Sequence, residues 1–89
     1  MDVTRIPLIA GNWKMNTTIA EGLALVEEIK AGVASARGAE VAVCAPFTHL
    51  AALADALRGS RIALGAQNVH WEEKGAFTGE VSPRMLAGL

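Results

Sequence analysis

Two polar residues that stand two positions apart, Asn12 and Lys14, have side chains suited to binding an oxyanion. They follow an apolar run, Pro7 to Ala10, which predicts a buried strand, and Gly11 permits close approach of a ligand or another backbone. Side chains at positions i and i+2 of extended chain leave the same side, so we expect Asn12 and Lys14 to point together while Trp13 packs. An amide and a cation at the end of a buried strand predict the rim of an active site.

Three strands are expected to carry this rim, at residues 7–10, 40–45 and 61–66. A helix should lie between the first two strands. Thr18 and Glu21 form a capping-box pattern at its start, and Gly38 is suited to stop it. Cys44, the single cysteine, lies in the second apolar run, so we expect a small core residue there and no internal disulfide.

Two further helices are expected. One follows Pro46 with Thr48 as its N-cap, and its apolar positions between Leu50 and Leu57 recur with helical spacing. The other begins at Ser82–Pro83, where Ser82 is the expected N-cap and Pro83 the first helical residue. The preceding stretch, Val69 to Gly79, is long for a strand-to-helix connection, and long loops are often functional.

Alternating strands and helices indicate an α/β fold in which consecutive βα units form a parallel sheet. This order of elements occurs both in doubly wound sheets and in (β/α)8 barrels. Periodicity alone does not choose between the two architectures.

Three segments of the sequence resemble motifs of the triosephosphate isomerase family, in the family's order and at about its spacing. They are Gly11-Asn12-Trp13-Lys14-Met15-Asn16, Gly65-Ala66-Gln67-Asn68 and Gly75-Ala76-Phe77-Thr78-Gly79-Glu80. The resemblance implies that residues 1–89 form part of one domain, the N-terminal three βα units of a (β/α)8 TIM barrel, with parallel strands and covering helices. A complete barrel has about 250 residues, so the resemblance also implies that the remainder of the barrel is absent.

The family interconverts dihydroxyacetone phosphate and D-glyceraldehyde 3-phosphate by proton transfer through an enediolate, in glycolysis and gluconeogenesis. By resemblance, Lys14 is a catalytic residue, and Asn12 and Lys14 bind the substrate. No metal ion or organic cofactor is expected, because the sequence has no Cys/His cluster at metal spacing and no Gly-x-Gly-x-x-Gly motif.

The resemblance further implies a homodimer, formed through the loop of residues 69–80. In the family this loop docks against a second subunit, where Thr78 approaches the active site. The residues implied at the dimer interface or in support of the active site are Met15, Gln67, Asn68, Thr78, Gly79 and Glu80. A mobile surface loop is the simpler alternative, but it does not explain the apolar Phe77. Trp13 and Trp71 are expected to pack.

The family's catalytic histidine, on the fourth strand, and its later catalytic glutamate have no counterpart in this sequence. His49 and His70 do not occupy the matching place, and we expect both to be structural or exposed. The chain alone should therefore be inactive until the missing C-terminal barrel segment joins it. Two alternatives stay open: a non-catalytic truncated module that retains only the subunit-docking surface, and another phosphate-handling barrel enzyme.

Composition favours a soluble cytoplasmic protein. The formal net charge of −1 gives no reason to expect binding to nucleic acid or to an acidic membrane surface. No apolar run approaches the roughly 20 residues of a membrane span. The N-terminal segment, Met1 to Arg5, lacks the apolar core of a signal peptide.

Overall fold

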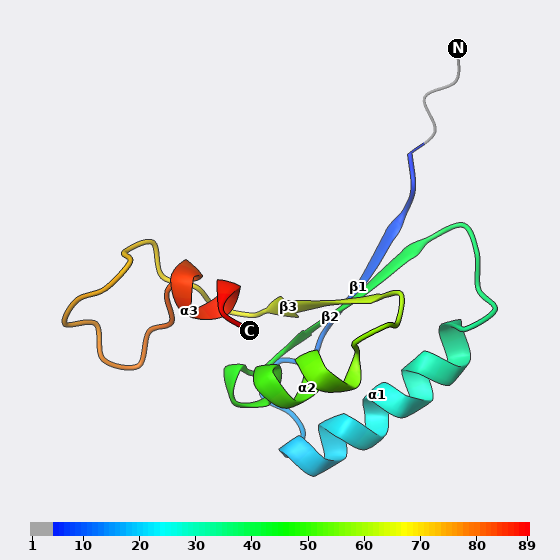
Figure 1. Cartoon of the computed structure of the whole chain (residues 1–89), viewed down its shortest axis with the longest axis horizontal. Helices are drawn as coiled ribbons and strands as arrows, with labels where there is room; N and C mark the ends of the chain where they lie inside the picture. Colours follow the sequence, from blue (N-terminus) through cyan, green and yellow to red (C-terminus); the bar gives the residue numbers. More distant parts are fainter. Residues whose placement is uncertain (1–4) are drawn as a thin grey trace.

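The protein is described by a computed structural model over residues 5–89, in which strands and helices alternate along the chain (Figure 1). The expectation that Met1 to Arg5 lack signal-peptide character falls mostly outside the described residues, which begin at Arg5. The elements are β1 (Leu8–Asn12), α1 (Ile19–Val33), β2 (Glu40–Ala45), the 3-10 helix η1 (Phe47–His49), α2 (Leu50–Ala56), β3 (Ile62–Ala66) and α3 (Pro83–Ala87). Within residues 5–89, no helix is long and apolar enough to cross a bilayer.

The sheet has the strand order β1-β2-β3, and both pairings are parallel, which confirms the α/β fold expected from the sequence. In its register, Asn12 lies opposite Cys44, and Cys44 lies opposite Gly65. Because parallel strands end at the same edge of a sheet, the residues that follow β1 and β3 are brought together there. This edge carries the first two of the three sequence motifs.

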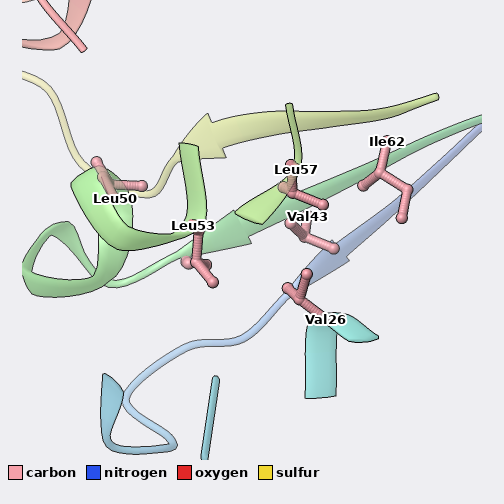
Figure 2. Close-up of a cluster of buried hydrophobic side chains, with 7 residues drawn as sticks. Val26, Val43, Leu50, Leu53, Leu57 and Ile62 are labelled. Carbon is pink, nitrogen blue, oxygen red and sulfur yellow. The ribbon is translucent and has the colours of Figure 1, made fainter. Parts of the chain in front are cut away.

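The core lies between the sheet and the two longer helices, α1 and α2, which cover the same face of the sheet (Figure 1). Leu53 of α2 and Val26 of α1 are completely buried, and their side chains gather around Val43 of β2 (Figure 2). The other buried apolar residues are Ala45, Leu50, Leu57 and Ile62. Burying a side chain of this size contributes about 1.5–3 kcal/mol to stability.

Strand β1 is exposed in this chain, so the expectation that it is buried is wrong here. Leu8 is 62% exposed and Ile9 is 60% exposed. The reason is topological, because β1 is an edge strand that pairs only with β2 among the described residues. The strand also extends through Gly11 to Asn12, beyond the expected end at Ala10.

Two of the three expected helix caps, at Thr18 and Ser82, are present, and the third, at Thr48, is not. Both halves of the capping box at Thr18 are present, and Ser82 caps α3 by accepting a hydrogen bond from the backbone N–H of Met85. Thr48 does not cap α2, because the chain forms a turn of 3-10 helix first and the Thr48 hydroxyl contacts the His49 ring instead. Helix α1 ends at Val33, and Gly38 adopts a positive φ in the connection to β2 rather than at the helix end.

Candidate active site

The polypeptide changes direction sharply just after β1. The backbone N–H of Trp13 still donates to the Cys44 carbonyl, at 3.0 Å, as a continuation of the β1–β2 ladder. Lys14 then has a φ of +56°, so the extended chain ends before it. The expectation that Asn12 and Lys14 share one side of an extended strand is therefore wrong in its premise.

The Asn12 side chain helps to form this turn. Its Oδ1 accepts a hydrogen bond from the backbone N–H of Lys14, at 2.9 Å. Further along the turn, the Asn16 side-chain amide donates to the Trp13 carbonyl oxygen at 2.7 Å. We call residues Asn12 to Thr17 the Lys14 turn. Each of these bonds spans only two or three residues, so the motif supplies some of the contacts that hold the turn.

The Lys14 turn ends in a second left-handed residue, Thr17, whose φ is +74°. A residue with a branched Cβ avoids this region of φ/ψ space, and the left-handed conformation costs roughly 1–2 kcal/mol. Such a conformation persists only where surrounding contacts hold it. The Thr17 hydroxyl donates to the Asn16 carbonyl, and both Thr17 oxygens contact Nε2 of His49.

Gln67, which directly follows β3, connects the three strand ends. Its Nε2 lies 2.9 Å from the Lys14 carbonyl oxygen and 3.1 Å from the Cys44 carbonyl oxygen. The Asn12 Oδ1 is the third oxygen near it, at 3.4 Å. Because one NH2 group carries two hydrogens, the two shorter contacts are the stronger bonds. A single side chain, directly after β3, thus holds the Lys14 turn against the end of β2.

The loop between β3 and α3 is closed at its base by residues of the second and third motifs. The Asn68 amide donates to Oε1 of Glu80 at 3.0 Å. The backbone N–H of His70 donates to the Val81 carbonyl at 2.8 Å. These two bonds bring the loop ends together, and the loop projects away from the sheet (Figure 1).

Three rings form a small cluster inside the loop. The His70 ring lies between Trp71 and Phe77, with centroid distances of 4.1 Å and 4.3 Å. Gly75 is required beside it, because a Cβ there would lie 2.6 Å from the Phe77 ring. Trp71 contacts the His70 ring and is 82% exposed, so its expected packing is found only in part.

The predicted site residues thus fall into separate groups. Asn12, Lys14 and Gln67 meet at the strand ends, while Asn68 and Glu80 meet at the loop base. Thr78 and Gly79 lie exposed on the loop, and Met15 is 95% exposed beside Lys14. Across residues 5–89, no cluster of three or more His, Cys, Asp or Glu side chains is placed to hold a metal ion.

His49 contacts the site, and the sequence did not predict this contact. His49 is only 3% exposed, and its ring contacts Thr17 of the Lys14 turn from 32 positions away in the chain. Trp13, by contrast, packs as expected, against the core and with an edge-to-face contact to His49 at a centroid distance of 6.4 Å. Nothing in the sequence near His49 indicates either contact.

The motifs and the fold agree with a comparison against known proteins. The sequence profile of the family described as triosephosphate isomerase matches residues 7–89, nearly the whole chain. The chain belongs to the triosephosphate isomerase family. The triosephosphate isomerase of Pelobacter propionicus is 58% identical over 82 residues, which is 92% of this chain and 33% of that relative. That of Herpetosiphon aurantiacus is 53% identical over 85 residues, or 96% of this chain and 34% of the relative.

A solved structure shows the same similarity in three dimensions. The crystal structure of triosephosphate isomerase from Bartonella henselae superposes with a TM-score of 0.86 at 43% sequence identity. The match covers 94% of this chain and 34% of that structure. The sheet and its helices are therefore arranged as in part of a triosephosphate isomerase barrel, which decides between the barrel and the doubly wound sheet. The chain spans about a third of the length of the relatives that it matches.

Proposed function

We propose that this chain supplies the Asn12 and Lys14 part of a triosephosphate isomerase active site. In that role it takes part in the interconversion of dihydroxyacetone phosphate and D-glyceraldehyde 3-phosphate through an enediolate, in glycolysis and gluconeogenesis. The observation that carries the proposal is the Lys14 turn, held at the strand ends by Gln67, in a chain of this family.

The proposed chemistry depends on charge that develops on oxygen. Removing a proton beside a carbonyl places negative charge on the carbonyl oxygen, and the substrate already carries a phosphate. The Lys14 ammonium takes part in neither of the two ion pairs found within residues 5–89, so it is available to an anionic substrate. Donors fixed before the reaction stabilise such charge more in the transition state than in the ground state.

Asn12 contributes a second donor in this proposal. The contacts to the Lys14 N–H and to Gln67 both use the Asn12 oxygen, Oδ1. The Nδ2 group of the same amide is then directed by those contacts, and we assign it to a substrate oxygen. Gln67 supports the pair by fixing the Lys14 carbonyl, because a preorganised site loses no free energy to reorientation during the reaction.

The loop of residues 69–80 is proposed to form a homodimer by docking near the Lys14 turn of a second subunit. Its exposed Trp71 and Phe77 provide apolar area, and aromatic residues are enriched at the centres of interfaces. Thr78 and Gly79 would then reach the partner's site, and exposed Met15 would line the surface that receives the loop. Asn68 and Glu80 would keep the loop base closed. We place this enzyme in the cytoplasm.

A general acid and a general base must come from the remainder of the barrel. Residues 5–89 contain two histidines, His49 and His70, and we assign neither of them to proton transfer. The C-terminal barrel segment is the proposed partner that supplies the catalytic histidine and glutamate. The 89-residue chain alone should therefore show no turnover.

A grafted enzyme tests the proposal. Residues of this chain replace the matched segment of the Pelobacter propionicus enzyme, to which they are 58% identical. We expect the grafted enzyme to isomerise triose phosphates and the purified 89-residue chain to be inactive. A folded, dimeric grafted enzyme without turnover would instead indicate a docking module that lacks the catalytic role.

A further inference from the structure

His49 contacts the Lys14 turn from the junction of η1 and α2, and both of its ring nitrogens are in contact with oxygens. Its Nδ1 lies 2.9 Å from the Thr48 hydroxyl, and its Nε2 lies 3.0 Å from the Thr17 hydroxyl and 3.2 Å from the Thr17 carbonyl oxygen. A buried imidazole with both nitrogens partnered is held in one orientation.

The contacts indicate which nitrogen carries the proton. The Thr17 carbonyl oxygen can only accept, and the Thr17 hydroxyl already donates to the Asn16 carbonyl. Nε2 therefore carries a hydrogen and is the donor to the Thr17 oxygens, while Nδ1 lies against the Thr48 hydroxyl. The ring thus acts on the turn as a fixed hydrogen-bond donor.

His49 contacts the Lys14 turn on both sides of Lys14. Before Lys14, the Trp13 ring meets the His49 ring edge to face, with an interplanar angle of 79°. After Lys14, Nε2 holds Thr17, the residue whose left-handed backbone needs support. Because the turn between these contacts is short, its backbone has little freedom to move while both contacts are intact.

We infer that His49 is a positioning residue, which sets the place of the Lys14 ammonium by holding Trp13 and Thr17 on either side of it. The inference rests on the proposed function of Lys14 and adds a residue to it. His49 does not touch the substrate in this arrangement. Misplacement of a reacting group by about 1 Å can cost a hundredfold in rate, so loss of the donor should be visible in catalysis.

The test is a comparison of variants in the grafted enzyme. His49→Phe keeps a ring and removes both nitrogens, whereas His49→Gln keeps an N–H donor near the position of Nε2. We expect His49→Phe to lower kcat/KM by about 10- to 100-fold, mainly through kcat, and His49→Gln to recover most of that loss. Ile62→Val, at a buried position of β3, serves as a mildly destabilised control that should keep normal kcat.

The deciding measurement repeats the His49→Phe substitution in a variant that lacks the Lys14 ammonium. If His49 acts by placing Lys14, then His49→Phe in a Lys14→Met background should cost less than about threefold, because coupled residues are not additive. Equal losses in the two backgrounds would overturn the inference and leave Lys14 catalytic.

A normal rate for Lys14→Met alone would overturn the proposed function, and the inference with it. If His49→Phe does not fold, Thr17→Val removes the hydroxyl side of the contact, and the same two backgrounds are compared.

Discussion

The carboxamide nitrogen of Gln67 lies 2.9 Å from the carbonyl oxygen of Lys14, although the two residues are 53 positions apart in the chain. The same nitrogen lies 3.1 Å from the Cys44 carbonyl oxygen. Since the two carbonyls belong to different strand ends, one side chain fixes their relative position. The Lys14 turn is therefore held by Gln67, directly after β3, and by His49, at the end of η1.

Gln67→Met in the grafted enzyme should weaken this connection. Methionine has a similar length and no N–H donor, so the bonds to both carbonyl oxygens are lost. We expect the free energy of unfolding to fall by about 1–3 kcal/mol, since a hydrogen bond contributes about 0.5–1.5 kcal/mol. Steady-state kinetics should show about a tenfold loss of kcat/KM. Gln67→Glu, which puts a carboxylate against carbonyl oxygens, should lose more than Met; an unchanged Met variant would remove Gln67 from the support of the turn.

Lys14→Met should remove the charge and keep most of the packing of the side-chain stem. Loss of a preorganised electrostatic group costs roughly 3–4 kcal/mol, so kcat/KM should fall about a hundred- to a thousandfold. Lys14→Arg should recover only part of this rate, because the guanidinium is larger and planar. The midpoint of thermal unfolding should change little, since the side chain is exposed. Near-normal kinetics in a folded Lys14→Met variant would return Lys14 to the class of ordinary surface lysines.

Two glycines of the same helix, α1, should respond oppositely to alanine. A Cβ at Gly22 would lie 2.9 Å from Cδ2 of His49 and 3.1 Å from Cζ3 of Trp13, whereas a Cβ at Gly32 would meet no atom within 4 Å. We expect Gly32→Ala to stabilise the grafted enzyme by roughly 0.5–1 kcal/mol through helix propensity, and Gly22→Ala to destabilise it by about 1–3 kcal/mol through overpacking. Denaturant unfolding measures both. A Gly22→Ala variant as stable as Gly32→Ala would mean that the two rings move aside freely.

Deleting Gly75–Gly79 should convert the grafted enzyme from dimer to monomer and lower its activity strongly. The deletion removes Phe77 and Thr78, which the proposed interface needs, and leaves the bond between Asn68 and Glu80 at the loop base. Sedimentation velocity gives the oligomeric state, and circular dichroism checks the fold. A same-length replacement of residues 75–79 by Ser and Gly separates loop length from side-chain identity. An intact dimer after both changes would place the interface elsewhere.

The elements of the fold were predictable because their signals are local. The capping box at Thr18 and the Ser82–Pro83 start each depend on residues within one helical turn, and both were found as predicted. The predicted Thr48 cap is absent because its hydroxyl has a competing partner, the neighbouring His49 ring. That ring becomes buried only in the folded chain. The prediction that β1 is buried was wrong because the exposure of a strand depends on which elements cover it. An apolar run in the sequence does not show whether those covering elements are present.

The site could be predicted in its composition but not in its geometry. The motif around Lys14 was found from its residues, whereas the left-handed backbone at Lys14 contradicts the extended chain from which the side-chain directions were derived. The contact between His49 and Thr17 has no sequence signal, because it forms when η1 and the Lys14 turn meet in space. Contacts of this kind depend on tertiary packing and are invisible to periodicity.

The narrow space above Gly22 has a consequence for how this family can vary. A Cβ at residue 22 would lie 2.9 Å from the His49 ring and 3.1 Å from the Trp13 ring, so we expect a side chain there to need a displaced or smaller residue at position 49 or 13. A sequence in which residue 22 is enlarged before residue 49 changes passes through an overpacked intermediate. A sequence in which residue 49 is reduced in size first loses its bond to Thr17. Either order carries a penalty, so we expect Gly22 and His49 to form an epistatic pair, in which the effect of changing one residue depends on the other.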